Sequence, residues 1–319
     1  MNWFTNLFTN KNENEKKLKT GIVFSGGGVR GFAYIGVMRA LKEAGISFDY
    51  VAGTSIGSLM GALYAMDMPI EQMEQYALKV KQSDFTNSKL IFVPNKTDRY
   101  EKMVAKLIGE NTFETLKKPL CIVAVDLISG KEVHITSGNL VKAIVGSCAV
   151  PGVFTPVEYG KMRLVDGLLT NNIPADALRN MGADIVVSLD INPTRGYGTK
   201  STKMLEVLKA SLRILMVSNA VNGYVYSDYI IKIDLSEFSQ LKISNTLELM
   251  KRGYIATKKC IPEILEVLNK KEADKNIKKM NRKILAIKKK SEQLDKLTKS
   301  LTEREKLELK KIGKEQKEI

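Results

Sequence analysis

The sequence predicts an α/β domain built on a largely parallel sheet, because strand-like apolar runs alternate with helical patterns along most of the chain. The apolar runs are short and show no alternation with polar residues. Strands of this kind are typical of a sheet that helices cover on both faces. We therefore expect a buried sheet with helices on either side of it.

The predicted elements follow one another in order. Strands are expected at Gly21–Ser25, Tyr50–Ala52, Leu120–Asp126, Met162–Val165, Asp184–Asp190 and Tyr229–Asp234. Helices such as Phe32–Ala44, Ile56–Met66, Arg99–Gly109 and Asn139–Cys148 lie between them. Each helix shows apolar residues at helical spacing, which indicates one buried face.

The charge of the chain is concentrated at its end. The 319 residues carry a formal charge of +15, and the segment from Lys270 to Ile319 holds 18 basic and nine acidic residues. Met280, Ile287, Leu294 and Leu301 are spaced seven apart there, which predicts a charged helix or a short, imperfect coiled coil. This tail could bind anionic lipid, pair two chains or remain a solvated helix. We expect no nucleic-acid partner, since acidic residues interrupt the lysines and no aromatic residue is present to stack on bases.

The start of the chain shows no basic segment followed by a long apolar core, so a secretory signal is not expected. Trp3, Phe4, Leu7 and Phe8 would share one face of a short helix, which would dock on its own domain or anchor the protein at a bilayer. We expect three parts: residues 1–18, residues 19–268 and residues 269–319. Three scattered cysteines, Cys121, Cys148 and Cys260, are too few for a disulfide framework and indicate buried small residues in a reducing compartment. We expect the protein in the cytoplasm, where it could also make peripheral contact with the inner face of the membrane.

A glycine cluster follows the first predicted strand, in the stretch GIVFSGGGVRGF. Gly26, Gly28 and Gly31 match the G-x-G-x-x-G of a dinucleotide phosphate loop. The same backbone amides, at the start of a helix, could instead stabilise the oxyanion of an acyl transfer.

A second motif favours acyl transfer. Gly53-Thr54-Ser55-Ile56-Gly57 reads G-x-S-x-G between a predicted strand and a predicted helix, which is the pattern of a nucleophile elbow. The sharp turn leaves no room beside the serine, so both glycine positions must be small. Dinucleotide binding would need an acidic residue at the end of the second strand, and Asp49 instead precedes that strand.

The serine needs a base. His134 is the only histidine, and it lies in a segment that reads as an ordinary strand. Asp166, in the stretch LVDG, ends a predicted strand and is the better candidate. An aspartate has an ordinary pKa of about 3.9, so this pairing depends on direct contact with the serine and on strong oxyanion stabilisation.

Together these motifs resemble the patatin-like phospholipases, in the branch of small bacterial proteins. GGGVRG is similar to the family's oxyanion block, GTSIG to its nucleophile elbow and VDG to its aspartate motif, and AIVGSCAVPGVFTPV is similar to a central block. The resemblance covers about Lys19 to Leu268 and implies a three-layer sandwich with a Ser-Asp dyad. It implies Ser55 as the nucleophile, Asp166 as its partner, Gly26, Gly27, Gly28 and Arg30 as the oxyanion loop, and Gly53 and Gly57 as the elbow glycines. Leu168 departs from the family's pattern, which usually has Gly or Ala there; it would narrow the pocket or pack beneath the loop.

The sequence therefore predicts a serine acyl hydrolase of lipid esters, of phospholipase A or lysophospholipase type, that contacts membranes and requires no cofactor or metal. The stretch Ser88–Thr97 could form a flap over the acyl pocket or a plain buried connection. Two other functions stay open at this point: a membrane- or partner-binding scaffold with a vestigial site, and nucleotide binding by the glycine loop.

Overall fold

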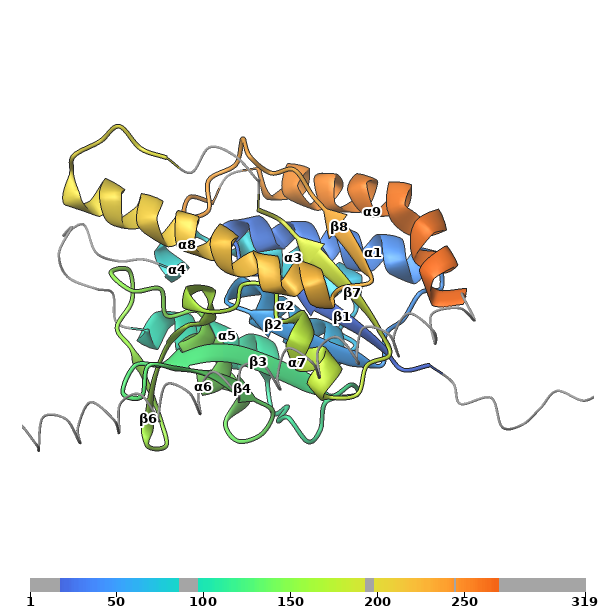
Figure 1. The fold of residues 1–319 in the computed structure, drawn as a ribbon, viewed down its shortest axis with the longest axis horizontal. Helices are drawn as coiled ribbons and strands as arrows, with labels where there is room; N and C mark the ends of the chain where they lie inside the picture. Colours follow the sequence, from blue (N-terminus) through green and yellow to red (C-terminus); the bar gives the residue numbers. More distant parts are fainter. Residues whose placement is uncertain (1–17, 86–96, 193–197, 244, 270–319) are drawn as a thin grey trace, which may run out of the picture. The chain divides into compact units, whose positions relative to one another are not determined.

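A computed structural model describes residues 18–85, 97–192, 198–243 and 245–269 (Figure 1). The chain divides into two units, residues 1–269 and 270–319, and the described residues all belong to the first. The predicted N-terminal helix, most of the stretch Ser88–Thr97 and the charged tail lie outside the described residues. Among the described helices, none combines the length and the apolar character needed to cross a bilayer.

The elements are as follows. The strands are β1 (Thr20–Phe24), β2 (Tyr50–Thr54), β3 (Leu120–Asp126), β4 (Lys131–Ile135), β5 (Val157–Tyr159), β6 (Met162–Asp166), β7 (Ile185–Asp190) and β8 (Tyr229–Lys232). The helices are α1 (Ala33–Glu43), α2 (Ile56–Ala65), α3 (Ile70–Lys79), α4 (Gln82–Phe85), α5 (Asp98–Ile108), α6 (Leu140–Ser147), α7 (Ala175–Asn180), α8 (Met204–Tyr226) and α9 (Thr246–Asn269), with short 3-10 turns η2 (Gly28–Phe32) and η3 (Gly167–Leu169).

The strands form one mixed sheet. Its order is β5-β6-β3-β2-β1-β7-β8, with β4 paired to β3 as well. The five strands β3, β2, β1, β7 and β8 are parallel, while β4, β5 and β6 run antiparallel to their neighbours. The prediction of a largely parallel sheet is confirmed.

Two strands share one edge of β3, and this arrangement builds the site. Residues 122 and 123 of β3 pair with both β2 and β4, and residues 124–126 pair with both β4 and β6. Because a strand has only two edges, β2 and β6 must lie end to end along the edge opposite β4. Thr54 lies opposite Val123 and Asp166 opposite Ala124, so the carboxyl ends of β2 and β6 meet.

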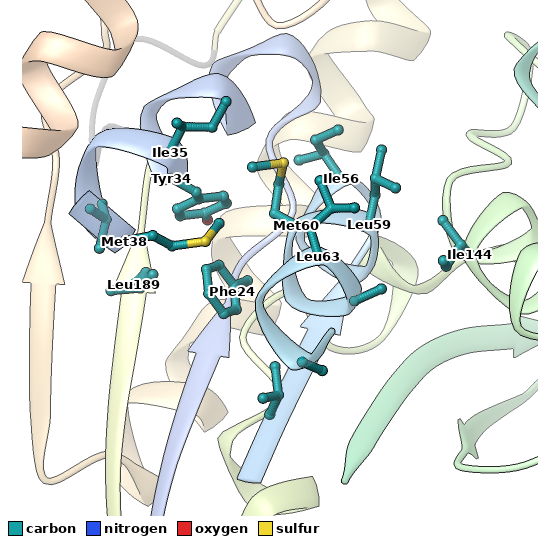
Figure 2. Packing of buried hydrophobic residues seen from close by; sticks show 14 of the residues in the cluster. Phe24, Tyr34, Ile35, Met38, Ile56, Leu59, Met60, Leu63, Ile144 and Leu189 are labelled. Carbon is teal, nitrogen blue, oxygen red and sulfur yellow. The ribbon is translucent and has the colours of Figure 1, made fainter. Parts of the chain in front are cut away.

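A hydrophobic core lies on each face of the sheet, because successive side chains of a strand point to opposite faces. On β1, Ile22 and Phe24 belong to the larger core, while Val23 belongs to the smaller one. Figure 2 shows part of the larger core, where Phe24 packs edge to face with Tyr34 at 5.1 Å between ring centroids. Helices α1, α2, α3, α5, α6 and α9 bury residues in the larger core, and α7 and α8 in the smaller one. The predicted three layers are confirmed.

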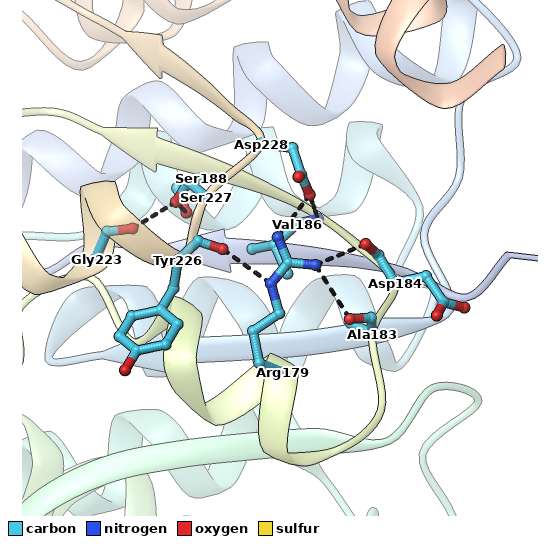
Figure 3. Close-up of polar contacts among 9 residues, drawn as sticks. All are labelled: Arg179, Ala183, Asp184, Val186, Ser188, Gly223, Tyr226, Ser227 and Asp228. Atoms are coloured by element: carbon cyan, nitrogen blue, oxygen red, sulfur yellow. Dashed lines mark hydrogen bonds and ion pairs between the residues drawn. The ribbon is translucent and has the colours of Figure 1, made fainter. Parts of the chain in front are cut away.

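Helix α8 is held mainly through its C-terminal half. Asn219 donates from Nδ2 to the Leu169 carbonyl at 2.6 Å, and Tyr224 donates to Asp190 Oδ2 at 2.5 Å. At the end of the helix, Arg179 of α7 donates to the carbonyl of Tyr226, the last residue of α8, and pairs with Asp228 just beyond it at 2.7 Å (Figure 3). These contacts fix the end of α8 against β7.

The sequence patterns predict six of the strands, and the predicted ends of each lie within two residues of the observed ends. The short edge strand β5 was not expected, and β4 was expected only as the strand around His134. Helices α3, α4, α7, α8 and α9 were not predicted as separate elements. Of these, α8 proves to matter most for the site.

Candidate active site

Ser55 occupies a strained turn between β2 and α2. Its backbone has φ 55° and ψ −131°, a conformation that L-residues rarely adopt. A Cβ on Gly53 would come within 2.3 Å of the Gly57 carbonyl oxygen, and one on Gly57 within 2.0 Å of the Phe24 carbonyl oxygen. Both positions therefore require glycine, as the G-x-S-x-G pattern predicts. The turn presents the Ser55 hydroxyl at the N-terminus of α2.

The Ser55 hydroxyl donates to Asp166 Oδ2 at 2.6 Å. Asp166 is fully buried, and its other carboxylate oxygen accepts the Leu168 N–H at 2.9 Å. Burial raises the pKa of Asp166 to about 7, although the hydrogen bonds from Ser55 and Leu168 act in the opposite direction. An aspartate with this pKa is a far stronger base than an exposed one, which reduces the weakness noted from the sequence alone.

A third buried side chain, Ser147, hydrogen-bonds to the backbone of the nucleophile elbow. Its hydroxyl accepts the Ser55 backbone N–H at 2.8 Å and donates to the Val123 carbonyl of β3 at 2.6 Å. Ser147 is fully buried at the end of α6. Sequence reasoning did not single it out, although it lies in the stretch AIVGSCAVPG that the family resemblance includes.

The glycine loop after β1 has two free amides. The Gly26 N–H donates to the Asn172 carbonyl at 3.3 Å and the Val29 N–H to the Gln240 carbonyl at 2.9 Å. In the described part of the chain, no hydrogen bond uses the N–H groups of Gly27 or Gly28, and both residues line the same pocket as Ser55. Of the three glycines named from the sequence, Gly27 and Gly28 thus keep donors for an oxyanion, while Gly26 is engaged in the fold.

Arg30 supports this loop from behind. Its Nε and Nη2 donate to the Phe238 carbonyl at 2.9 and 2.6 Å, and the residue is largely buried. The same segment crowds Gly28, where φ is +61° and a Cβ would lie 2.0 Å from the Gln240 carbonyl oxygen. The stretch 235–241 is therefore a structural partner of the loop. Nothing in the sequence pointed to it, since it lies about 200 residues further along.

Asp49 does not lie where a dinucleotide site would need it. Its carboxylate accepts the Thr20 N–H at 2.9 Å and the Thr20 hydroxyl at 3.1 Å, at the start of β1. The glycine loop follows the opposite end of the same strand. The geometry therefore offers no acidic ribose partner beside the loop at this position.

His134 lies on β4 and contacts Glu132, with Nε2 2.6 Å from Oε1. It pairs in register with Val123, so the whole of β3 separates it from β2, a distance of about 10 Å between strand axes. The hydrogen bond to Glu132 raises the pKa of His134. The structure brings Asp166, and not His134, to Ser55.

Glu132, His134 and Asp176 form the one group in the described residues whose ligand atoms are close enough for a metal ion, within 4.8 Å of one another. The Asn171 amide donates to Glu132 at 3.1 Å and to Asp176 at 2.8 Å. Because these hydrogen bonds account for the approach of the carboxylates, the group needs no cation to explain it.

An open pocket of about 530 Å³ lies over Ser55. One side is formed by Gly27, Gly28 and Arg30 with residues 236–241, and another by Glu206, Lys209, Leu212, Arg213 and Met216 of α8. Leu168 lines the pocket and is largely buried. Val150 and Val153 add further apolar surface.

The three cysteines differ in burial. Cys121 and Cys148 are buried, as expected, while Cys260 is half-buried. Burial raises the pKa of the Cys148 thiol to about 12, and the Tyr100 hydroxyl donates to its sulfur at 3.2 Å. A thiol with this pKa is inert at neutral pH.

Comparison with known proteins gives the same family that the motifs resemble. Residues 22–179 match the patatin-like phospholipase family. An uncharacterized NTE family protein of Mycobacterium tuberculosis is 31% identical over 185 residues, covering 56% of this chain and 32% of that protein. Lysophospholipase nte1 of Aspergillus fumigatus is 30% identical over 181 residues, covering 54% of this chain and 12% of that protein. Neuropathy target esterase sws of Drosophila melanogaster is 31% identical over 183 residues, covering 54% of this chain and 13% of that protein.

The fold has a known counterpart as well. VipD from Legionella pneumophila matches with a TM-score of 0.56 and 15% identity, over 78% of this chain and 67% of that one. This chain spans about a third or less of the length of the curated relatives named above. The segment that matches the family, residues 22–179, includes the glycine loop, the elbow, Asp166 and most of the strands that carry them. The chain belongs to the patatin-like phospholipase family.

Proposed function

We propose that this chain is a serine acyl hydrolase of lipid esters, of phospholipase A or lysophospholipase type. The observation that carries the proposal is the 2.6 Å hydrogen bond from the Ser55 hydroxyl to a fully buried Asp166, beside the Gly27 and Gly28 amides, which have no hydrogen-bond partner among the described residues. A nucleophile, a base and oxyanion donors are the three parts that acyl transfer needs. The names of the relatives, a lysophospholipase and an esterase, agree with this activity.

In the first half of the reaction, Ser55 Oγ attacks the ester carbonyl carbon while its proton passes to Asp166 Oδ2. The carbonyl oxygen gains a negative charge, and the Gly27 and Gly28 N–H groups donate to it. The tetrahedral intermediate collapses, the bond to the alcohol oxygen breaks, and that oxygen takes the proton from Asp166. An acyl-serine remains.

In the second half, a water molecule attacks the acyl-serine and gives its proton to Asp166. The bond from the carbonyl carbon to Ser55 Oγ breaks, Ser55 regains the proton, and the fatty acid leaves. The pKa of about 7 suits Asp166 for both halves, since the group must accept and return a proton near neutral pH. Arg30 would act behind the loop by holding the segment around Phe238, rather than by touching the oxyanion.

The apolar residues of the pocket favour an acyl chain as the bound group. Val150, Val153, Leu168 and Met216 line the same cavity as Ser55. The basic residues Lys209 and Arg213 stand on another side of it and suit a phosphate group. Contact with a membrane surface follows from such a substrate. Location of the protein in the cytoplasm and pairing of two chains through the tail remain predictions.

The test is covalent labelling with a fluorophosphonate probe. We expect the wild-type protein to label at Ser55, Ser55→Ala to lose all labelling, and Asp166→Asn to label far more slowly. Hydrolysis of a short water-soluble ester should fall by about 10⁴-fold or more in Ser55→Ala. A folded wild-type protein that neither labels nor hydrolyses the ester would contradict the proposal and favour a scaffold with a vestigial site.

A further inference from the structure

Helix α8 carries an unusual surface on the side away from the pocket. Its outer stripe consists of exposed apolar residues at helical spacing, with only the uncharged Ser211, Ser218 and Asn222 among them. The members of the outer stripe are Met204, Val207, Leu208, Ile214, Leu215, Val221 and Val225. The stripe runs the whole length of the helix, which is 23 residues long. Contiguous apolar surface of this extent marks a contact surface rather than ordinary exposure.

The opposite face of α8 lines the pocket over Ser55, so the outer stripe lies close to the candidate active site. Glu206, Lys209, Arg213 and Met216 repeat at intervals of three and four, so they share the face that lines the pocket. The helix thus has the pocket on one side and the outer stripe on the other. A surface that touched the outer stripe would lie about one helix diameter, ~10 Å, from the pocket.

The charges around the stripe indicate what that surface is. Residues 200–226 contain four basic residues and one acidic residue. Lys200 and Lys203 are exposed just before the helix, where the stripe begins, while Lys209 and Arg213 belong to the pocket face. An exposed apolar helix face with exposed lysines at one end and no acidic residue within it is the pattern of a helix that lies in the interface of a bilayer containing anionic lipid.

We propose that the outer stripe of α8 docks this protein on an anionic lipid bilayer, with the pocket held directly beneath the helix. This inference rests on the proposed acyl hydrolase function, because a lipid ester is drawn from such a surface. The apolar side chains enter the boundary between headgroups and acyl chains, and Lys200 and Lys203 reach the phosphates. A substrate then passes from the bilayer beside α8 to Ser55 without crossing bulk water.

The experiment measures binding of the full chain to vesicles made of equal parts phosphatidylcholine and phosphatidylglycerol. All proteins carry Ser55→Ala in this assay, so that the bilayer is not hydrolysed. The test variant is Ile214→Gln with Val221→Gln, which are 55% and 56% exposed. The control variant is Leu78→Gln with Leu247→Gln, which are 54% and 66% exposed on α3 and α9. We expect the dissociation constant to rise about tenfold or more in the test variant and to change less than about twofold in the control.

Three results would overturn the proposal. Equal vesicle binding by the test and control variants would place the membrane contact elsewhere. A lower melting temperature of the test variant with unchanged vesicle binding would mean that another part of the chain covers the stripe. A smaller sedimenting species for the test variant alone, without vesicles, would make the stripe an interface between copies.

Hydrolysis of p-nitrophenyl butyrate, measured with Ser55 intact, separates this proposal from the function on which it rests. The ester is dissolved in water, so the test variant should cleave it at the wild-type rate. If no variant cleaves it while the test variant loses vesicle binding, the function fails and the docking surface stands. If all variants cleave it and vesicle binding is unchanged, the docking surface fails and the function stands.

Discussion

The two sides of the pocket are built in different ways. On the sheet side, Ser55, Asp166 and the glycine loop are buried, and backbone groups from several strands and turns fix them. On the α8 side, a single helix is anchored near its C-terminal end while its N-terminal half lines the pocket and exposes apolar side chains. The two sides of the pocket therefore have different roles in the proposed reaction. Under the proposed function, the sheet side holds the reacting groups and the α8 side determines how substrate arrives.

On the sheet side, we expect the largest loss of activity from a substitution of Gly28. An alanine there would need φ +61° and would place Cβ 2.0 Å from the Gln240 carbonyl oxygen, so the loop must move. We expect Gly28→Ala to lower kcat/KM for a short ester by about 10²- to 10³-fold, which is the effect of losing an oxyanion donor. Gly45→Ala is a matched control, because Gly45 also has a positive φ, +68°, but nothing lies within 4 Å of its added Cβ. A similar loss in both variants, measured by steady-state kinetics, would argue that backbone strain alone is responsible.

The pH dependence probes the same side through Asp166. Only the deprotonated carboxylate can accept the serine proton, and the pKa is about 7. The value of kcat/KM for a short ester should therefore fall as pH drops, by about tenfold per unit below pH 7, or roughly 100-fold at pH 5. A flat profile between pH 5 and 8 would contradict Asp166 as the base.

Protonation of Asp166 should leave the fold intact. Its pKa in the folded protein lies above the ordinary value, so this group favours the folded state at low pH and loses that contribution as pH rises through about 7. Circular dichroism at pH 5 should accordingly show a folded protein, which makes the loss of activity chemical rather than structural.

Ser147→Ala tests whether the elbow depends on a side chain from outside it. The substitution removes the acceptor of the Ser55 N–H and leaves that buried donor without its partner. We expect kcat to fall by about tenfold with KM nearly unchanged, because the nucleophile is misplaced while the pocket is kept. Ser147→Thr should restore part of the rate, since it retains the hydroxyl. Wild-type kcat in Ser147→Ala would exclude a positioning role.

The smallest expected effect lies on the α8 side. Asn219 donates to the Leu168 and Leu169 carbonyls at 3.2 and 2.6 Å, and so joins α8 to the turn after Asp166. Asn219→Ala should cost about 1 kcal/mol of unfolding free energy and change turnover of a short ester by less than about threefold. Asn222→Ala, at an exposed position of the same helix, should change neither quantity in urea unfolding and kinetic assays. A large loss of ester turnover in Asn219→Ala would mean that α8 takes part in the chemistry.

The sequence predicted the features that depend on local patterns. Glycines flank Ser55 because the turn there leaves no space, and the strands β1, β2 and β3 are apolar because both faces of the sheet are covered. The pairing of Asp166 with Ser55, 111 residues apart, was predicted from strand ends and from the family resemblance, and the geometry agrees.

Other features depend on contacts between distant segments, which leave no local pattern. Arg30 reaches Phe238 across 208 positions, and Ser147 reaches Ser55 across 92. The surface of α8 was missed for a different reason. Apolar residues lie on both the buried and the exposed side of this helix. The usual rule that an apolar face is a buried face therefore could not tell the two sides apart.

The meeting of β2 and β6 along one edge of β3 has a consequence for folding. Asp166 is opposite Ala124, next to the Val123 that faces Thr54, so Asp166 reaches Ser55 only if both strands are in register. A slip of β6 by a single residue would turn Asp166 to the other face of the sheet. Under the proposed mechanism, catalytic activity therefore reports on strand alignment. During refolding, ester hydrolysis should return only after the last strand of this edge is correctly seated, later than the recovery of secondary structure.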